Sequence, residues 1–286
     1  MAKSRAFSAP GKALLAGGYL VLDPKYRSYV VALSSRMHSV VTQNDSKDKS
    51  KIRVTVLSSQ FNEDCWCYEL SESDNYKPVE VNGLRNPFVE KTLVNVLNYF
   101  QPKSDMTPNI SIEIYSDSGY HSQEGSVPRR NSFKQFNFHK NTITQVPKTG
   151  LGSSAGLVTV LSAGLISCFK PDLDVISQDH LTLIHNIAQV SHCQAQGKVG
   201  SGFDVAAATF GSILYQRFAP ELINNLPPVD SGEYHDSLVK LVDEIDWKIT
   251  NERIKLPPGL RLVMGDVNNG SETTKLVAKV NEWYAK

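Results

Sequence analysis

A segment of glycines and serines, VPKTGLGSSAGLVTVL from Val146 to Leu161, has the residue types that bind an anion. Gly150 and Gly152 lie close together just before an apolar run, although a single serine would cap a helix there without the entropic cost of two glycines. Two glycines are useful where the backbone must approach a ligand, with N–H groups and the positive end of a helix dipole facing phosphate oxygens. The segment therefore predicts a phosphate-binding turn at the start of a buried helix.

Two other interpretations of this segment explain less. Its G-x-G-x-x-A spacing matches the loose dinucleotide-binding pattern, but that fold needs an acidic residue at the end of a second strand, and Asp172 follows Pro171 in a loop. The Walker pattern G-x-x-x-x-G-K-[ST] is absent from the sequence. A structural role, with Ser153 or Ser154 capping a buried helix, accounts for the serines but leaves the paired glycines unexplained.

Two further segments carry a charged residue beside glycines. Near the amino terminus, SAPGKALLAGGYLVL places Lys12 after a Pro-Gly turn. In HCQAQGKVGSGFDVAAATFG, a Gly-Ser-Gly turn precedes Asp204 at the start of an alanine-rich helix. An isolated lysine is usually solvated, and an acid in the first turn of a helix is favourable for the dipole alone. Neither residue indicates a site by itself.

Length and composition limit the class of protein. The 286 residues are 41% hydrophobic and 21% charged, which suits one large or two smaller globular domains. The formal net charge of +1 favours neither nucleic acid nor an anionic membrane as a partner, and we expect contact with neither. The start of the chain lacks a secretory apolar core, and the longest apolar run is shorter than the about 20 residues of a membrane-spanning helix. We therefore expect a cytoplasmic protein with reduced cysteines.

Hydrophobic periodicity predicts a strand-rich first half followed by helices. Strands are expected at residues 18–22, 29–33, 51–57, 109–116 and 212–218. Helices are expected at residues 86–100, 154–169 and 179–196, the first with Asn86 as its cap and Pro87 as its first residue. From Leu260 the pattern predicts a strand, a turn and a helix.

Two polar segments and a cysteine pair complete this outline. The segments, from Thr42 to Lys51 and from Ser116 to Asn141, predict loops that are either disordered or functional lids. The sequence CWC lies in an alternating pattern, which would put Cys65 and Cys67 on the same face of a strand.

Together, the three glycine-rich segments resemble the motifs of the GHMP kinases, and PKTGLGSSAG matches that family's ATP-binding signature. The resemblance implies an α+β fold with a ribosomal protein S5 domain 2-like amino-terminal domain over residues 1–255. Residues 256–286 would be only the beginning of a ferredoxin-like carboxy-terminal domain, so we expect the chain to be a fragment. ATP as co-substrate, Mg²⁺ and small-molecule substrates are also implied, whereas the oligomeric state is not.

The resemblance further implies roles for particular residues. The ATP-binding residues would be Pro147, Lys148, Thr149, Gly150, Leu151, Gly152, Ser153, Ser154, Ala155 and Gly156. Ser154 would also contact the metal. Lys12 and Asp204 would be the catalytic residues and would face each other beside the acceptor. The acceptor would be bound by Lys198, Ser201 and Ser271.

Within the family, the likeness is to members that act on phosphomevalonate, which implies a phosphate as the acceptor group. A phosphate monoester is mostly ionised at pH 7, so Asp204 is expected to orient Lys12 rather than remove a proton. Lys12, Lys148 and Lys198 are expected to offset the charge of two polyanions. The alternatives are a member that acts on mevalonate and a non-catalytic nucleotide-binding homologue.

One departure from the family concerns the metal. Family members that act on mevalonate carry a metal-binding glutamate on the helix before the third segment, whereas AQVSHCQAQGK from Ala188 to Lys198 contains no carboxylate. Mg²⁺ would therefore depend on Ser154, phosphates and water, which is acceptable for an ion that commonly keeps several waters. His192 lacks further ligands at suitable spacing and does not predict a metal site.

Overall fold

The fold comes from a computed structural model that describes residues 3–46, 50–62, 64–103, 108–131, 134–265, 279–280 and 282–283. Its strands are β1 (Lys3–Ala16), β2 (Arg27–Asp45), β3 (Ile52–Ser58), β4 (Asp64–Leu70), β5 (Val79–Glu80), β6 (Pro108–Ser116), β7 (Val127–Asn131), β8 (Lys134–Phe138), β9 (Ile213–Gln216) and β10 (Thr250–Arg253). Its α-helices are α1 (Pro87–Phe100), α2 (Ser153–Phe169), α3 (Gln178–Gln196), α4 (Phe203–Phe210), α5 (Glu221–Asn224) and α6 (Tyr234–Val239).

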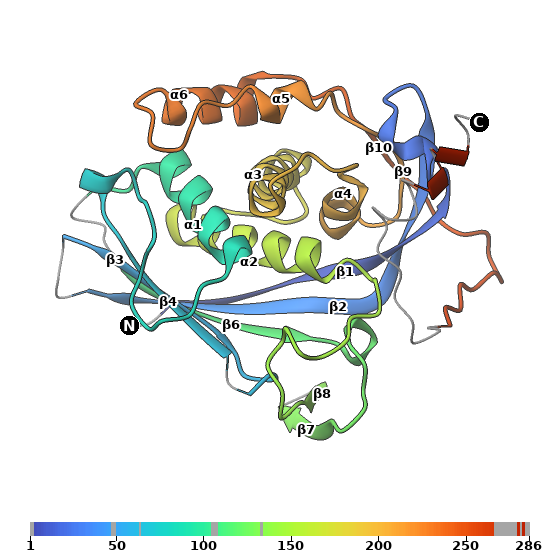
Figure 1. The fold of residues 1–286 in the computed structure, drawn as a ribbon, viewed down its shortest axis with the longest axis horizontal. Coiled ribbons are helices and arrows are strands. Elements are labelled where there is room, and N and C mark those ends of the chain that lie inside the picture. The colour runs from blue at the N-terminus through green and yellow to red at the C-terminus, as the bar shows by residue number, and fades with distance from the viewer. Residues whose placement is uncertain are drawn as a thin grey trace.

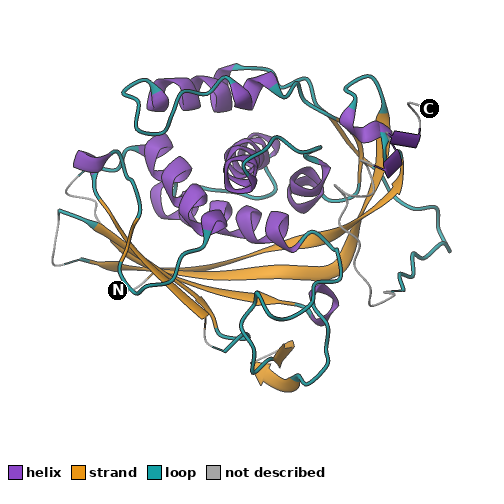
Figure 2. Ribbon diagram, in the orientation of Figure 1, coloured by secondary structure: helices purple, strands orange, loops and turns teal. Residues whose placement is uncertain are grey.

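An eight-stranded sheet carries the helices on one face (Figure 1). Its strand order is β10-β9-β2-β6-β3-β4-β5, and β1 pairs with the long β2. The pairings are antiparallel except for that of β3 with β6, which is parallel. Figure 2 shows α1 to α4 packed between the strands and an outer layer formed by α5 and α6. The predicted α+β class is confirmed.

Helix α1 begins where the sequence predicts. The side chain of Asn86 accepts hydrogen bonds from the N–H groups of Phe88 at 3.1 Å and Val89 at 3.4 Å, and Pro87 occupies the first helical position. These bonds satisfy two of the N–H groups that a helix start leaves free. The helix ends at Phe100, as predicted from its apolar spacing.

Helix α2 is the central helix and is buried from Ala155 to Cys168. It is apolar on all sides because it packs on β1 and β2 as well as on α1, α3 and α4. Gly164 permits a close approach to the sheet, since a Cβ there would lie 2.4 Å from Cγ2 of Val41. The turn that precedes α2 is consequently fixed to the core of the molecule.

The amino-terminal region differs from its prediction. Residues 18–22 do not form a strand: residues 20–22 are a short 3-10 helix, after Gly17 with φ of 89°. Instead, residues 3–16 form β1, which pairs with β2 through a register shift at Pro10. Proline interrupts the hydrogen-bond ladder, so the sequence of β1 does not show clean strand alternation.

The polar segment from Ser116 to Asn141 is structured over its described part. It contains a 3-10 turn at residues 118–120 and the hairpin of β7 and β8. The Gln60 amide attaches it to the sheet, donating to the carbonyls of Ser116 at 3.1 Å and Asn137 at 2.9 Å. Figure 1 shows the hairpin on the side of the sheet opposite the helices. The other polar segment is shorter than predicted because β2 continues to Asp45.

Other predictions have mixed outcomes. Within Leu260–Gly265 the structure has no strand, and most of the predicted final helix lies outside the described residues. The predicted domain boundary at residue 255 follows β10 by two residues and stays a prediction.

The sulfur atoms of Cys65 and Cys67 lie 3.6 Å apart on one face of β4, and all four cysteines are free, as predicted. Over the described ranges, no helix is long and apolar enough to cross a membrane.

Candidate functional site

The three glycine-rich segments meet around one cavity of about 680 Å³, which we call the motif cavity. Lys12 reaches it from β1, Gly150 to Ser154 form the turn and first residues of α2, and Lys198 to Asp204 form the turn before α4 and its first two residues. The predicted residues that line it are Lys12, Lys148, Gly150, Gly152, Ser153, Ser154, Lys198, Ser201 and Asp204. Residues far apart in the sequence are thus brought together as the motifs predict.

The turn before α2 depends on its two glycines. Gly150 and Gly152 have φ values of 81° and 84°, in the left-handed region that other residues rarely adopt. Gly152 is the N-cap of α2, and no side chain caps the helix, so the suggestion that Ser153 or Ser154 serves as the cap is wrong. The N–H groups of the first turn lack a side-chain acceptor and leave the positive end of the helix dipole open.

Five of the predicted ATP-binding residues do not line the motif cavity and instead fix the turn: Pro147, Thr149, Leu151, Ala155 and Gly156. Thr149 donates from its N–H to the carbonyl of Tyr120 at 3.2 Å and from its hydroxyl to that of Gly119 at 2.5 Å. The Gly156 N–H is used within the helix, donating to the Gly152 carbonyl at 3.0 Å. Leu151 and Ala155 are buried in the core.

Lys12 is held against the turn before α2. Its Nζ donates to the Gly150 carbonyl at 2.9 Å and lies 5.5 Å from the ring centroid of Phe203. Burial lowers the pKa of Lys12, and the nearby Asp204 carboxylate opposes that shift. A Cβ on Gly152 would lie 3.2 Å from Cε of Lys12 and 3.8 Å from Cβ of Asp204, so both side chains lie beside this glycine.

The predicted pairing of Lys12 with Asp204 is therefore only partly realised. Both residues line the motif cavity, but the ion pairs found in the described part of the chain do not include one between them. Lys12 is directed to the glycine turn, and Asp204 accepts a hydrogen bond from the Val205 N–H at 3.0 Å. A ligand between them could contact both groups.

Ser154 has a partner that the sequence did not identify. Its hydroxyl lies 3.1 Å from Nε2 of His192, a residue of α3 that is 3% exposed and packs against the ring of Phe88. His192 also lines the motif cavity. Among the described residues no group of three or more His, Cys, Asp or Glu could hold a metal ion.

Two of the three predicted acceptor-binding residues lie at the motif cavity. Lys198 and Ser201 line the motif cavity, and Lys198 is exposed. Lys148, also exposed, lines this cavity and the adjoining one described next. Ser271 lies outside the described residues.

A second cavity of about 340 Å³, here called the Trp66 cavity, adjoins the first. Its walls include the apolar side chains of Trp66, Phe88 and Leu157, and it shares Lys148, Ser153 and Ser154 with the motif cavity. The sequence analysis missed this cavity because its walls come from β4, the loop before α1, and α2, which carry no common motif. The only local signal was the Asn86-Pro87 helix start, which lies at its rim.

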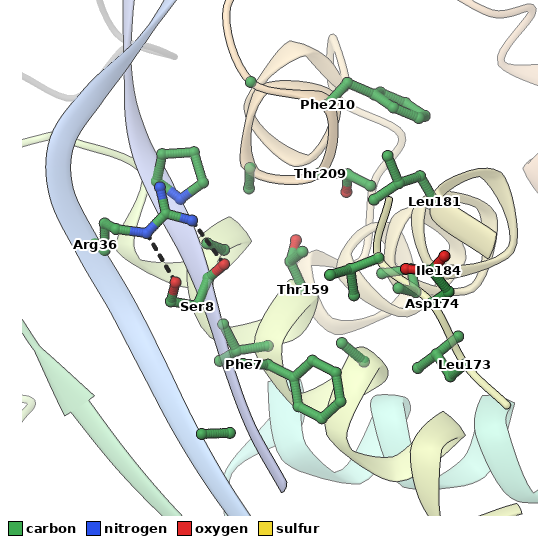
Figure 3. Close-up of a pocket in the computed structure, with 18 of the residues that line it drawn as sticks. Phe7, Ser8, Arg36, Thr159, Leu173, Asp174, Leu181, Ile184, Thr209 and Phe210 are labelled. Atoms are coloured by element: carbon green, nitrogen blue, oxygen red, sulfur yellow. Dashed lines mark hydrogen bonds between the residues drawn. The ribbon is translucent and has the colours of Figure 1, made fainter. Parts of the chain in front are cut away.

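A third cavity, of about 710 Å³, lies between β1, α2, α3 and α4 (Figure 3). Arg36 closes one side by donating from Nε to the Ser8 hydroxyl at 2.8 Å and from its terminal nitrogen to the Ser8 carbonyl at 2.9 Å. Phe7, Leu181 and Phe210 contribute apolar walls. None of the predicted site residues lines this cavity, so we assign it no part in the chemistry.

Comparison with known proteins gives a family match and close relatives. Residues 91–212 match the model of the GHMP kinases N terminal domain. The chain is 49% identical over 285 residues to a phosphomevalonate kinase of Candida albicans, an alignment that covers 98% of this chain and 64% of that protein. It is 39% identical over 299 residues to phosphomevalonate kinase ERG8 of Gibberella zeae, covering 97% and 66%. The chain thus spans just under two thirds of the length of these relatives.

Solved structures share the fold at low sequence identity. A Streptococcus pneumoniae phosphomevalonate kinase in complex with phosphomevalonate and AMPPNP superposes with a TM-score of 0.54 at 18% identity, over 88% of this chain and 59% of that one. The Lin0012 protein of Listeria innocua superposes with a TM-score of 0.58 at 17% identity, over 99% and 66%. These structures show the shared fold, and the family model together with the fungal relatives shows that the chain belongs to the GHMP kinase family.

Proposed function

We propose that this chain takes part in transferring the γ-phosphoryl group of ATP to (R)-5-phosphomevalonate, giving 5-diphosphomevalonate and ADP. The observation that carries the proposal is the convergence of Lys12, the turn before α2 and the turn before α4 on one cavity. The fungal relatives named as phosphomevalonate kinases support this choice of acceptor. In the reaction an acceptor-phosphate oxygen bonds to the γ-phosphorus while the bond to the β–γ bridging oxygen breaks, and ADP leaves.

ATP would lie across the two adjoining cavities. The N–H groups of the Gly150–Gly152 turn and the start of α2 would hold the phosphates, because they combine free donors with a positive helix terminus. The base would occupy the Trp66 cavity, whose apolar walls suit a flat aromatic ring. Lys148, Ser153 and Ser154 line both cavities and lie where the phosphate chain would pass from one to the other.

Mg²⁺ fits this site with few protein ligands. The motif cavity offers the Ser154 hydroxyl and the Asp204 carboxylate as oxygen ligands. Since Mg²⁺ prefers oxygen and usually keeps several waters, phosphate oxygens and water would complete its shell. When bound, the ion would neutralise charge on the transferred phosphoryl group. The His192 ring would orient the Ser154 hydroxyl through the 3.1 Å contact.

The acceptor would lie on the opposite side of the motif cavity, beside Lys198 and Ser201, and we retain Ser271 as a further candidate. Lys12 would bridge the glycine turn and the moving phosphoryl group, and its positive charge would stabilise the negative charge that develops there. Asp204 would orient the acceptor or the metal rather than act as a base, because a phosphate monoester is already mostly ionised at pH 7.

Two further proposals concern organisation and location. Residues 1–255 would form the ATP-binding domain, and residues 256–286 would begin a second domain. A cytoplasmic location is supported by four free cysteines, since disulfides are rare in that compartment.

ADP release tests the proposed function. The chain is incubated with Mg-ATP alone, with phosphomevalonate added, and with mevalonate added. Release that depends on phosphomevalonate supports the proposal. Release with mevalonate instead would assign the alcohol as acceptor, and nucleotide binding without release in any mixture would favour a non-catalytic role.

A further inference from the structure

We propose that Arg217 and Tyr215 are positioning residues for the acceptor side of the motif cavity. They turn the carbonyl groups of the turn from Val199 to Ser201 away from the cavity, so that the N–H groups of Ser201 and Gly202 face an anion within it. The proposal rests on the proposed function only for the identity of that anion, the phosphate of the acceptor.

Arg217 follows β9 and is 9% exposed. Its guanidinium group donates to the carbonyls of Val199 at 3.1 Å and Gly200 at 2.7 Å. Its other terminal nitrogen donates to the Leu22 carbonyl at 2.7 Å. Leu22, Val199 and Gly200 all line the motif cavity, so one buried side chain ties together two segments of its wall.

Tyr215 holds the next carbonyl of the same turn. Its hydroxyl donates to the Ser201 carbonyl at 2.8 Å, and its side chain is fully buried. Tyr215 and Arg217 are two residues apart, and side chains at that separation in an extended segment lie on the same side. Three consecutive carbonyls, from Val199 to Ser201, are thus bonded to side chains of this segment.

Gly202 fits tightly against the same group. It has a φ of 80°, and a Cβ there would lie 2.8 Å from the Tyr215 hydroxyl and 2.9 Å from Oε1 of Gln189. Both the backbone conformation and the contact exclude a side chain. The turn is therefore pressed onto Tyr215.

Peptide geometry gives the direction of the N–H groups. The described chain has no cis peptide bonds, and in a trans peptide the C=O and the following N–H point to opposite sides. With the carbonyls of Gly200 and Ser201 turned to Arg217 and Tyr215, the N–H groups of Ser201 and Gly202 point away from those side chains. Neither N–H has an acceptor among the described residues, and both residues line the motif cavity.

The positive charge of Arg217 also favours the binding of an anion beside this turn. Among the described residues it forms no ion pair with a carboxylate, and its hydrogen bonds go to neutral carbonyls. A buried charge of this kind is screened weakly by solvent, so it attracts an anion on the other side of the turn. Lys12 and Lys198 supply cations from other sides of the cavity.

Affinity measurements on variants test the positioning role. Calorimetry would compare the wild-type chain with Tyr215→Phe, Arg217→Lys and Arg217→Met, using phosphomevalonate and, separately, Mg-AMPPNP. Tyr215→Phe should weaken acceptor binding about 2- to 10-fold, and Arg217→Met about 10- to 100-fold, as expected for a neutral and a charged hydrogen bond. Arg217→Lys should recover part of that loss. The affinity of each variant for Mg-AMPPNP should stay within about two-fold of the wild-type value, since the turn before α2 that would bind its phosphates is a different segment.

Tyr26→Phe and Arg253→Met are the controls, because these side chains are exposed and line no part of the motif cavity. Equal losses for acceptor and AMPPNP in Tyr215→Phe would indicate a general structural role and overturn the proposal. Unchanged acceptor affinity in both Tyr215→Phe and Arg217→Met would overturn it as well.

A second readout separates this proposal from the proposed function. Inorganic phosphate is titrated into ¹⁵N-labelled chain, and the amide resonances of Ser201 and Gly202 are followed. They should shift in the wild type and shift less in Tyr215→Phe. If phosphomevalonate fails to bind while these shifts occur, the positioning role stands and the assigned substrate is wrong. If the two amides do not respond to phosphate, the positioning role is wrong.

Discussion

The Nζ atom of Lys12 donates a hydrogen bond to the Gly150 carbonyl at 2.9 Å, joining the amino-terminal strand to the glycine turn before α2. The Lys12 N–H strengthens this link by donating to the Leu151 carbonyl at 3.1 Å. The lysine is therefore part of the framework of the turn and also a cation at the motif cavity. This double role explains why its removal should affect catalysis more than that of an exposed lysine.

Lys12→Ala should lower turnover by about 100-fold or more, because it removes a preorganised cation from the position where charge develops. The measurement is kcat at saturating ATP and phosphomevalonate. Lys25→Ala, a change at an exposed lysine, is the control and should leave kcat unchanged. A loss of less than about three-fold in Lys12→Ala would exclude this role, since it is smaller than one hydrogen bond to a charged group supplies.

Asp204→Asn should lower kcat by less than about 10-fold, below the range typical of a lost general base. The reason is that the acceptor phosphate is already mostly ionised at pH 7. The measurement is again kcat at saturating ATP and phosphomevalonate. If Asp204→Asn proves more damaging than Lys12→Ala, Asp204 removes a proton and the orienting role is wrong.

Gly152→Ala should weaken ATP binding by about 5- to 30-fold, corresponding to the 1–2 kcal/mol cost of a left-handed conformation for an L-residue. The added Cβ would also press on Lys12, 3.2 Å away. Calorimetry with Mg-AMPPNP measures the effect. Gly18→Ala is the matched control, because it has open space around its Cα and no positive φ. Equal affinities for the two variants would argue against a tight glycine turn at the phosphates.

Ser154→Ala should raise the Mg²⁺ concentration needed for half-maximal turnover, because it removes one of the two protein oxygen ligands proposed for the ion. A magnesium titration of the rate at fixed ATP measures the change. His192→Phe should act in the same direction but more weakly, since it removes only the group that orients the hydroxyl. An unchanged magnesium dependence in Ser154→Ala would remove Ser154 from the metal site.

Stability should fall as the pH drops below about 6.5. Burial lowers the pKa of His185 to about 4, and burial together with nearby Lys148 and His139 lowers the pKa of His121 to about 4. The unfolded chain therefore binds more protons than the folded one between pH 6.5 and 4, and each histidine costs about 2 kcal/mol of stability by pH 5.

Urea unfolding at pH 7 and pH 5 measures this loss. His185→Leu should reduce the difference between the two pH values, because it removes a group that must be neutral in the fold. Equal unfolding free energies at pH 7 and pH 5 in the wild type would contradict the assignment of buried neutral histidines.

The parts of the fold that the sequence predicted are those with strong local signals. Asn86 and Pro87 fixed the start of α1, and paired glycines marked the turn before α2. Strand β1 escaped prediction because Pro10 interrupts its alternation and its stability comes from pairing with β2. Tertiary pairing of this kind leaves little trace in the sequence of one strand.

In the candidate site, too, the residues with a local sequence signal were predicted and those that depend on tertiary contacts were not. Lys12, Ser154 and Asp204 were predicted because each lies in a motif, and they line one cavity. Trp66 and Arg217 were missed because their roles depend on which distant segments they contact. Neither Trp66 nor Arg217 lies in a sequence motif whose residue spacing would indicate a site.

The central claim, phosphoryl transfer to a phosphate acceptor, is tested most directly by ³¹P NMR of the chain with Mg-ATP and phosphomevalonate. We predict that the phosphomonoester resonance of the acceptor is replaced by two coupled diphosphate resonances, in an amount equal to the ADP formed. ADP accompanied by inorganic phosphate, with the acceptor resonance unchanged, would contradict the claim.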